Sequence, residues 1–99
     1  MKKAYFYSMM RTNDKTHAAP HFGYTDGFYY YYRSVYGSTW YAIHPENGLS
    51  ITTGKTRKEA QQKATAPSMA ERITEALKRN PQAADTFAKL KAEAETGAA

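Results

Sequence analysis

The sequence has no cysteine and no long apolar run, and these two absences exclude several classes of protein. Without cysteine, the chain has no disulfide, no thiolate metal site and no cysteine nucleophile. No apolar stretch reaches the roughly 18 residues that a membrane helix requires. The segment after Met1 is aromatic and soon interrupted by charged residues, which is unlike a signal peptide. We therefore expect a cytoplasmic protein that does not contact a membrane.

Catalytic motifs are also lacking. Gly54-Lys55-Thr56 resembles the end of a phosphate-binding loop, but Leu49 occupies the position where that motif needs its first glycine. Histidines occur at positions 17, 21 and 44, and Pro20 interrupts the helical spacing of the first two. No serine has the glycine pattern of a nucleophile elbow. We expect a protein that is not an enzyme and that binds no cofactor or metal.

Tyrosine and basic residues are abundant in the first part of the chain. All nine tyrosines lie before residue 42. The net charge is +5, and residues 1–66 hold nine basic against four acidic residues, whereas residues 67–99 hold five of each. A basic and aromatic segment favours an acidic partner, either nucleic acid or an acidic protein surface. The same net charge also serves the solubility of a small domain.

The first 54 residues have the pattern of strands and turns. Residues that favour strands predict them over 3–10, 28–35, 39–44 and 49–53, with a long loop over 11–26 that contains Pro20 and Gly23. Asn47-Gly48 is a tight-turn signal before the last of these strands. The strands after residue 27 are expected to form a three-stranded meander, and the position of the first strand in the sheet stays open.

The pattern becomes helical after residue 54. Thr56 and Glu59 fit a capping box that begins a helix, and Pro67 is expected to end it. A second helix follows, and Asn80-Pro81 begins a third, so the last two helices are predicted to form an αα-hairpin. We expect a single α+β domain over residues 1–99, with an antiparallel sheet of about four strands. Its β-rich, basic and aromatic part spans residues 1–54 and its helical part residues 55–96.

Alternation along a strand divides the run of tyrosines between two faces of the sheet. Tyr30 and Tyr32 point to one face, and Tyr29, Tyr31 and Arg33 point to the other. The face covered by the first helix is expected to comprise Tyr41, Ile43, Leu49 and Ile51, packed against Ala60 and Ala64. The opposite face is expected to be free, and it carries Tyr29, Tyr31, Trp40, His44, Ser50 and Thr52.

This free face and the basic start of the first helix are the predicted binding surface. Aromatic side chains supply buried contact area, while cations pair with phosphates or carboxylates. The predicted partner-binding residues are Tyr29, Tyr31, Arg33, Trp40, His44, Lys55, Arg57 and Lys58. Two alternatives stay open: the 11–26 loop or the first strand covers this face, or a second copy of the chain pairs with it as a homodimer.

Residues 28–66 resemble the β-β-β-α core of the HicB-type antitoxins. In that family a small sheet runs into a helix that begins Gly-x-Thr-x-x-Glu-Ala, and Gly54, Thr56, Glu59 and Ala60 match this start. The turn at Pro-Glu-Asn-Gly is shorter than the proline-rich segment usual in that family. The resemblance implies a small antitoxin that also binds its operator.

The same residues resemble a second family, the double-stranded RNA-binding domain. Its final helix opens with a basic segment that Lys55, Arg57 and Lys58 match, and in that family such residues contact phosphates across a groove. The N-terminal helix of the family is missing from this chain.

In size and style the chain is also similar to the small phage proteins known as anti-CRISPR proteins. Small single-domain proteins without cysteine or a catalytic motif and with an aromatic-rich sheet are typical of phage and mobile-element inhibitors, which share no common sequence signature. We expect a non-enzymatic inhibitor, encoded by a phage or mobile element, that binds a nucleic-acid-processing effector complex in the host cytoplasm. The alternative is a domain that binds nucleic acid directly, or a HicB-type antitoxin.

Overall fold

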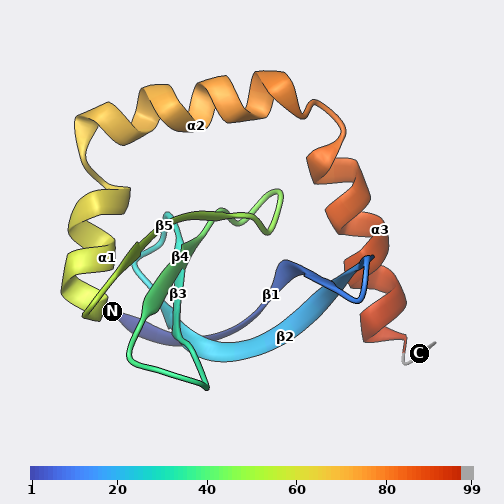
Figure 1. The fold of residues 1–99 in the computed structure, drawn as a ribbon, viewed down its shortest axis with the longest axis horizontal. Coiled ribbons are helices and arrows are strands. Elements are labelled where there is room, and N and C mark those ends of the chain that lie inside the picture. The colour runs from blue at the N-terminus through green and yellow to red at the C-terminus, as the bar shows by residue number, and fades with distance from the viewer. Residues whose placement is uncertain (97–99) are drawn as a thin grey trace.

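The computed structural model of the chain describes residues 1–96 and has an α+β fold (Figure 1). Five strands form one antiparallel sheet in the order β1-β2-β3-β4-β5. The strands are β1 (Lys2–Thr12), β2 (Lys15–Thr25), β3 (Tyr30–Arg33), β4 (Trp40–Ile43) and β5 (Ser50–Gly54). The helices are α1 (Arg57–Ala64), α2 (Pro67–Arg79) and α3 (Ala83–Glu95). The predicted α+β class is confirmed, and the predicted domain end at residue 99 lies outside the described residues.

The predicted loop over residues 11–26 is wrong, because most of it is strand β2. This strand pairs with β1 along its whole length. Asn13 and Asp14 form the turn between them, with φ angles of 51° and 63°, which are the positive values that a two-residue hairpin turn requires. Pro20 lies where β1 is the only neighbour of β2, since β3 pairs only with the last two residues of β2. A residue without an N–H is tolerated on such an edge.

Helix α1 begins as predicted. The side-chain oxygen of Thr56 accepts a hydrogen bond from the backbone N–H of Glu59 at 3.0 Å, which satisfies one of the free donors of the first turn. The Glu59 side chain pairs with Lys63 at 3.2 Å, one turn further along the helix, rather than reaching back to Thr56. The local signal therefore located the helix start correctly.

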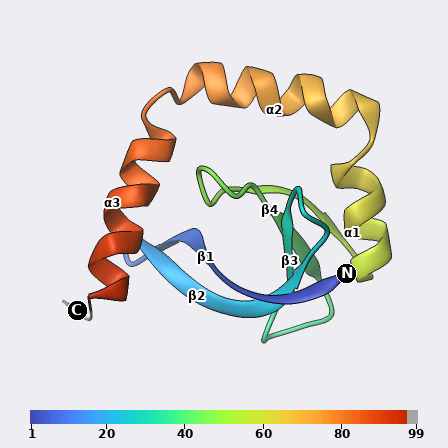
Figure 2. The same ribbon diagram turned by 180° about the vertical axis from the view of Figure 1, so that it is seen from behind.

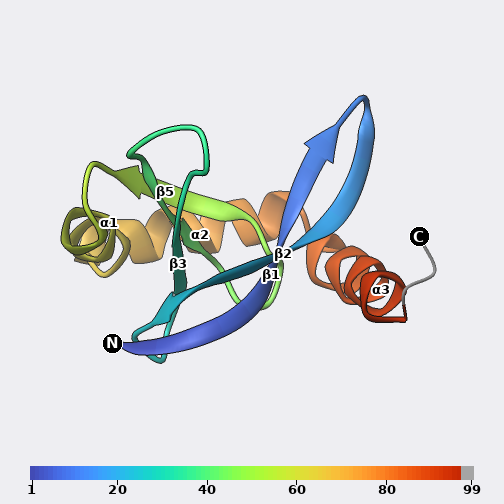
Figure 3. The same ribbon diagram turned by 90° about the horizontal axis from the view of Figure 1, so that it is seen from below.

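The three helices form an arch around the sheet (Figures 1 and 2). Helix α1 packs against β5, β4 and β3, and α3 packs against β2. The β1–β2 hairpin curls, and its tip projects away from α3 (Figure 3). Helix α2 crosses between them, and α3 turns away from it at a wide angle, so the predicted antiparallel αα-hairpin does not form. Among the helices of residues 1–96, none combines the length and apolar character needed to cross a bilayer.

The buried core beneath α1 is made of one large and three small side chains. Tyr31, Ala42, Ala60 and Ala64 are each at most 1% exposed. The small residues let the helix approach the sheet closely. At Gly54, an added Cβ atom would lie 2.6 Å from the backbone nitrogen of Ala60, so close packing at this point requires glycine.

The predicted assignment of the two sheet faces is therefore wrong. We expected α1 to cover the side chains of Tyr41 and Ile43, but it covers the face that carries Tyr31 and Ala42. The register of β4 and β5 shifts between Ala42 and Ile43, and this bulge brings Ile51 to the Ala42 side. Strict alternation through β5 could not anticipate the extra residue.

Candidate functional site

A broad hollow of about 710 Å³ opens beside the first turn of α1. Its wall combines aromatic side chains of the sheet with cations of the helix start. We call it the α1 hollow, and it is lined by Met1, Tyr24, Trp40, Lys55, Thr56, Arg57, Lys58 and Gln61. The structure thus brings together half of the predicted partner-binding residues, namely Trp40, Lys55, Arg57 and Lys58.

The strand register places the two aromatic side chains of the α1 hollow. Tyr24 lies opposite Tyr31 in the β2–β3 pair, so it shares the face that α1 covers. Trp40 lies opposite Gly54 at the end of β5, directly before the start of α1. The ring centroids of Tyr24 and Trp40 are 6.2 Å apart and the rings are tilted by 44°. Two strands that are not neighbours therefore contribute one aromatic wall.

The cations of the α1 hollow are available for an anionic partner. The guanidinium carbon of Arg57 lies 4.2 Å from the centroid of the Tyr24 ring, an interaction worth about 0.5–1 kcal/mol at an exposed position. Stacking on the ring orients the guanidinium and leaves its N–H groups able to bind a phosphate or carboxylate. Lys55 and Lys58 are exposed, and within residues 1–96 none of the three cations forms an ion pair. The N-terminus of α1 adds a partial positive charge.

Tyr31 does not belong to this surface, and its predicted place on a free face is wrong. It is 0% exposed, and its hydroxyl donates to Oδ2 of Asp26 at 2.7 Å. Burial, followed by the hydrogen bond and charge of Asp26, raises the pKa of Tyr31 far above its ordinary value. Burial also raises the pKa of Asp26, but hydrogen bonds from Tyr29, Tyr31, Phe28 and Gln61 outweigh it and hold that pKa below its ordinary value. Tyr31 is therefore a core residue that is hydrogen-bonded to Asp26, and it has no surface that a partner could contact.

The remaining predicted residues lie outside the α1 hollow. Arg33 is exposed and lies opposite Trp40 in the β3–β4 pair, next to the hollow but not in its wall. Tyr29 is half-buried against the core, and its ring centroid lies 6.3 Å from that of His44. Burial lowers the pKa of His44, and the charge of Glu46 partly opposes this. Tyr29 and His44 therefore form a separate pair at the other end of β4.

Sequence reasoning missed the aromatic residues of the β1–β2 hairpin. Tyr5 and Phe22 lie opposite each other, with ring centroids 4.7 Å apart, and are 83% and 55% exposed. Alternation places Phe22 on the same face of β2 as Tyr24, so the pair extends the aromatic wall away from α1. Lys3 lies opposite Tyr24 and adds a charge to this face. The alternating Phe22 and Tyr24 are a weak signal, which Pro20 and a neighbouring glycine hid.

The opposite face of the sheet carries a second aromatic cluster, whose members stack on one another: Phe6, His21, Tyr30, Tyr32 and Tyr41. The rings of His21 and Tyr32 are 3.8 Å apart and nearly parallel. Nε2 of His21 lies 2.6 Å from Oγ of Ser8, and burial lowers the pKa of His21. Ser8 is only 1% exposed, whereas His21 is half-buried and lines a hollow together with Tyr30 and Phe87.

The α1 hollow and the Tyr5–Phe22 pair together form the candidate functional site. Its chemistry is that of noncovalent binding: cations for an anionic group, and aromatic faces for stacking. The resemblances to HicB-type antitoxins and double-stranded RNA-binding domains stay predictions. No protein-family model, curated protein or solved structure matches the chain.

Proposed function

We propose that the chain is a non-enzymatic binding protein that recognises the phosphate backbone of a nucleic acid at the α1 hollow. One observation carries the proposal: Lys55, Arg57 and Lys58 gather beside Trp40 and Tyr24, with Arg57 held 4.2 Å above the Tyr24 ring. Phosphate groups are bound by such fixed guanidinium and ammonium groups, and a helix N-terminus adds to the attraction.

A single strand fits the surface better than a duplex. Tyr5 and Phe22 expose their rings on the same face of the hairpin as Tyr24 of the α1 hollow, although Tyr5 also lines a hollow with Phe87 of α3. Exposed rings of this kind can stack on unpaired bases, each such contact being worth about 1–3 kcal/mol. A duplex keeps the faces of its bases covered. The proposed arrangement therefore has the backbone at the helix start and one or two bases on the hairpin.

Fluorescence anisotropy with labelled oligonucleotides of about 15 nucleotides tests this proposal. Single-stranded and duplex forms of RNA and DNA are titrated between about 50 and 300 mM salt. We expect a single strand to bind best, with an affinity that falls as salt rises. Substituting Lys55, Arg57 or Lys58 by Ala reduces the slope of log affinity against log salt by about one each, or somewhat less on a single strand.

Lys89→Ala is the matched control for these variants. Lys89 is an exposed cation of α3, which packs against β2 on the opposite side of the molecule from α1 (Figure 1). This substitution removes the same charge from the whole molecule but leaves the α1 hollow intact. Absence of binding to every oligonucleotide at low salt would refute the proposal, and so would equal losses for Lys89→Ala and Arg57→Ala.

An acidic protein surface is the second candidate partner, in the form of a nucleic-acid-processing effector complex inhibited in the anti-CRISPR manner. The observation that favours it is the large exposure of Tyr5 beside Lys3 and Phe22, because exposed aromatic residues near cations are common anchors of protein interfaces. Size-exclusion chromatography with purified Cas effector complexes, with and without guide RNA, tests it. A stable complex that forms without RNA supports this candidate, whereas no complex with any effector type of the host rejects it.

A further inference from the structure

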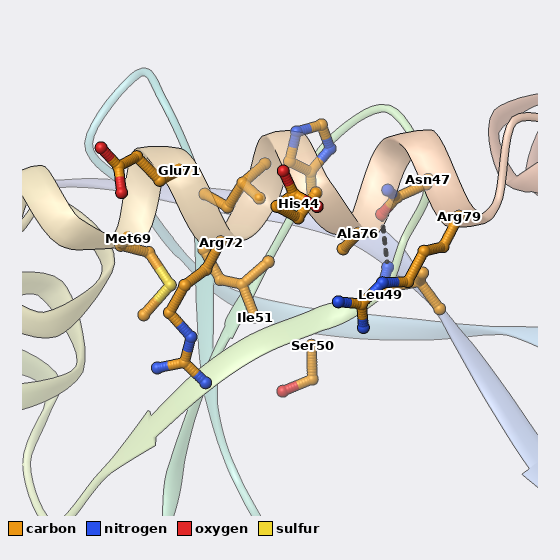
Figure 4. Close-up of a pocket in the computed structure, with 12 residues that line it drawn as sticks. His44, Asn47, Leu49, Ser50, Ile51, Met69, Glu71, Arg72, Ala76 and Arg79 are labelled. Atoms are coloured by element: carbon orange, nitrogen blue, oxygen red, sulfur yellow. Dashed lines mark hydrogen bonds between the residues drawn. The ribbon is translucent and has the colours of Figure 1, made fainter.

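A second cavity, of about 460 Å³, lies between α2 and β5 (Figure 4). Its volume falls within the range of about 300–1,000 Å³ that is usual for ligand pockets. Four apolar side chains, Leu49 and Ile51 of the sheet edge and Met69 and Ile73 of α2, contribute to its lining. None of the residues of the α1 hollow lines this cavity, so it is a separate site.

The sheet ends at β5, which pairs with β4 on one side and faces the cavity on the other. The bulge leaves Ile51 without a partner residue in β4. At the far end of β5 the backbone carbonyl of Thr53 is already occupied, because it accepts a hydrogen bond from the Lys63 side chain at 3.2 Å, so the edge available to an added chain lies before Thr53. An edge strand of this kind can pair with an added extended chain.

Two arginines of α2 overhang this edge. In Figure 4 the side chains of Arg72 and Arg79 reach down toward β5, while Glu71 points away from it. Glu75 lines the cavity as well, but neither arginine forms an ion pair with a carboxylate within the described residues 1–96. They are seven residues apart, which is about 10 Å along a helix, and this distance lies between the spans of two and four residues of an extended chain, whose side chains share one face. One short extended segment can therefore reach both guanidinium groups.

We propose that the cavity between α2 and β5 binds an extended acidic peptide segment of a partner protein. The backbone of the segment pairs with the outer edge of β5. Its apolar side chains enter the cavity near Ile51 and Met69, and its carboxylates bind Arg72 and Arg79. This mode of recognition obtains affinity from main-chain hydrogen bonds and specificity from alternate side chains.

A second copy of the chain is the less suitable occupant. Because α2 lies over the edge of β5 (Figures 1 and 4), the approach of another sheet would bring a second α2 and its arginines against the first. Like charges would then face each other across the interface. A peptide segment in one extended strand needs only the width of one chain beside β5.

A labelled heptapeptide of alternating valine and glutamate, blocked at both ends, is the probe for the test. Fluorescence anisotropy measures its binding to the full chain, and amide shifts in NMR spectra locate it. We expect saturable binding, with shifts centred on β5 and the facing side of α2. Arg72→Ala and Arg79→Ala each weaken binding at least about fivefold and together at least about tenfold, as expected for lost charge-assisted hydrogen bonds.

Matched controls separate charge from backbone pairing. Lys78→Ala removes a cation of the same helix that does not line the cavity, and it should leave binding unchanged. A peptide with lysine in place of glutamate, and one with N-methyl groups on alternate amides, should bind at least about tenfold more weakly. Circular dichroism confirms that each variant remains folded.

Three results would overturn the proposal. The first is no binding of the glutamate peptide up to about 1 mM, and the second is equal binding to wild type and to the Arg72 and Arg79 double variant. The third is a concentration-dependent dimer in sedimentation that the peptide does not displace, which would assign the cavity to a second copy of the chain. Oligonucleotide binding at the α1 hollow should not respond to the double variant, so the two proposals can fail independently.

Discussion

The hydroxyl of Tyr31 lies 2.7 Å from Oδ2 of Asp26 and donates a hydrogen bond to it. The same carboxylate accepts the backbone N–H groups of Phe28 and Tyr29 and, from α1, the side-chain amide of Gln61. One acidic residue thus connects the turn between β2 and β3, the buried face of the sheet and the helix that carries the cations. Gln61 also lines the α1 hollow, so this connection reaches the wall of the candidate site.

Replacing Tyr31 by Phe removes this donor while keeping the ring that fills the core. We expect the free energy of unfolding to fall by about 1–2 kcal/mol, because a hydrogen bond to a charged group is lost and Asp26 keeps its other partners. Urea denaturation followed by circular dichroism measures the change. Tyr36→Phe is the control, since Tyr36 is 97% exposed and its substitution should have little effect. An unchanged unfolding free energy in Tyr31→Phe would show that the bond does not stabilise the fold.

Asp26 should also make stability depend on pH. Its pKa is lower in the folded chain than in the unfolded chain, so the folded state binds fewer protons and stability rises with pH between the two pKa values. The contribution is fully present above the unfolded pKa of about 3.9 and is lost as pH falls through the folded value. We expect the stability difference between wild type and Asp26→Asn to shrink between about pH 5 and pH 2. A constant difference over this range would contradict the shift.

Local signals predicted the parts of the fold that depend on neighbouring residues. The start of α1 is a contact between Thr56 and Glu59, three residues apart, and the sequence shows both. Strand β2 was missed because Pro20 usually indicates a loop, and it is acceptable here only because β2 has a neighbouring strand on one side alone at this point. Which strands lie beside β2 at Pro20 is decided by the tertiary fold, and it cannot be inferred from a single sequence.

The candidate site was predicted in part for the same reason. Lys55, Arg57 and Lys58 are adjacent in the chain, so their clustering followed from the sequence. Tyr24 comes from the missed strand and reaches Arg57 only through folding. Tyr31 does share a face with Trp40, as alternation predicts, but α1 covers that face. The opposite face was chosen for α1 partly because of Ile51, which the bulge in the β4–β5 pair moves to the Ala42 side.

Gly48 should be intolerant of substitution. Its φ of 68° is in the left-handed region, and an added Cβ would lie 2.6 Å from Cδ1 of Phe87, the buried residue through which α3 packs on this turn. We expect Gly48→Ala to lower the unfolding free energy by about 2–4 kcal/mol, from backbone strain and overpacking together. Gly37→Ala is the control, because nothing lies within 4 Å of a Cβ at that position. Equal stability of the two variants in denaturant titrations would contradict the packing of α3.

The exposed side chains of Tyr5 and Phe22 on the β1–β2 hairpin provide a separate test of binding to single-stranded nucleic acid. Tyr5 and Phe22 carry no charge, so replacing either by Ala should weaken binding of a single-stranded oligonucleotide by about 1–3 kcal/mol, or roughly 5–150-fold, without changing the slope against salt. The same variants should leave the weaker binding to a duplex nearly unchanged. Anisotropy titrations at several salt concentrations measure both quantities.

Val35→Ala is the control, since Val35 is 89% exposed and lies outside the α1 hollow. If Tyr5→Ala and Phe22→Ala bind a single strand as tightly as Val35→Ala does, the bases do not stack on this hairpin.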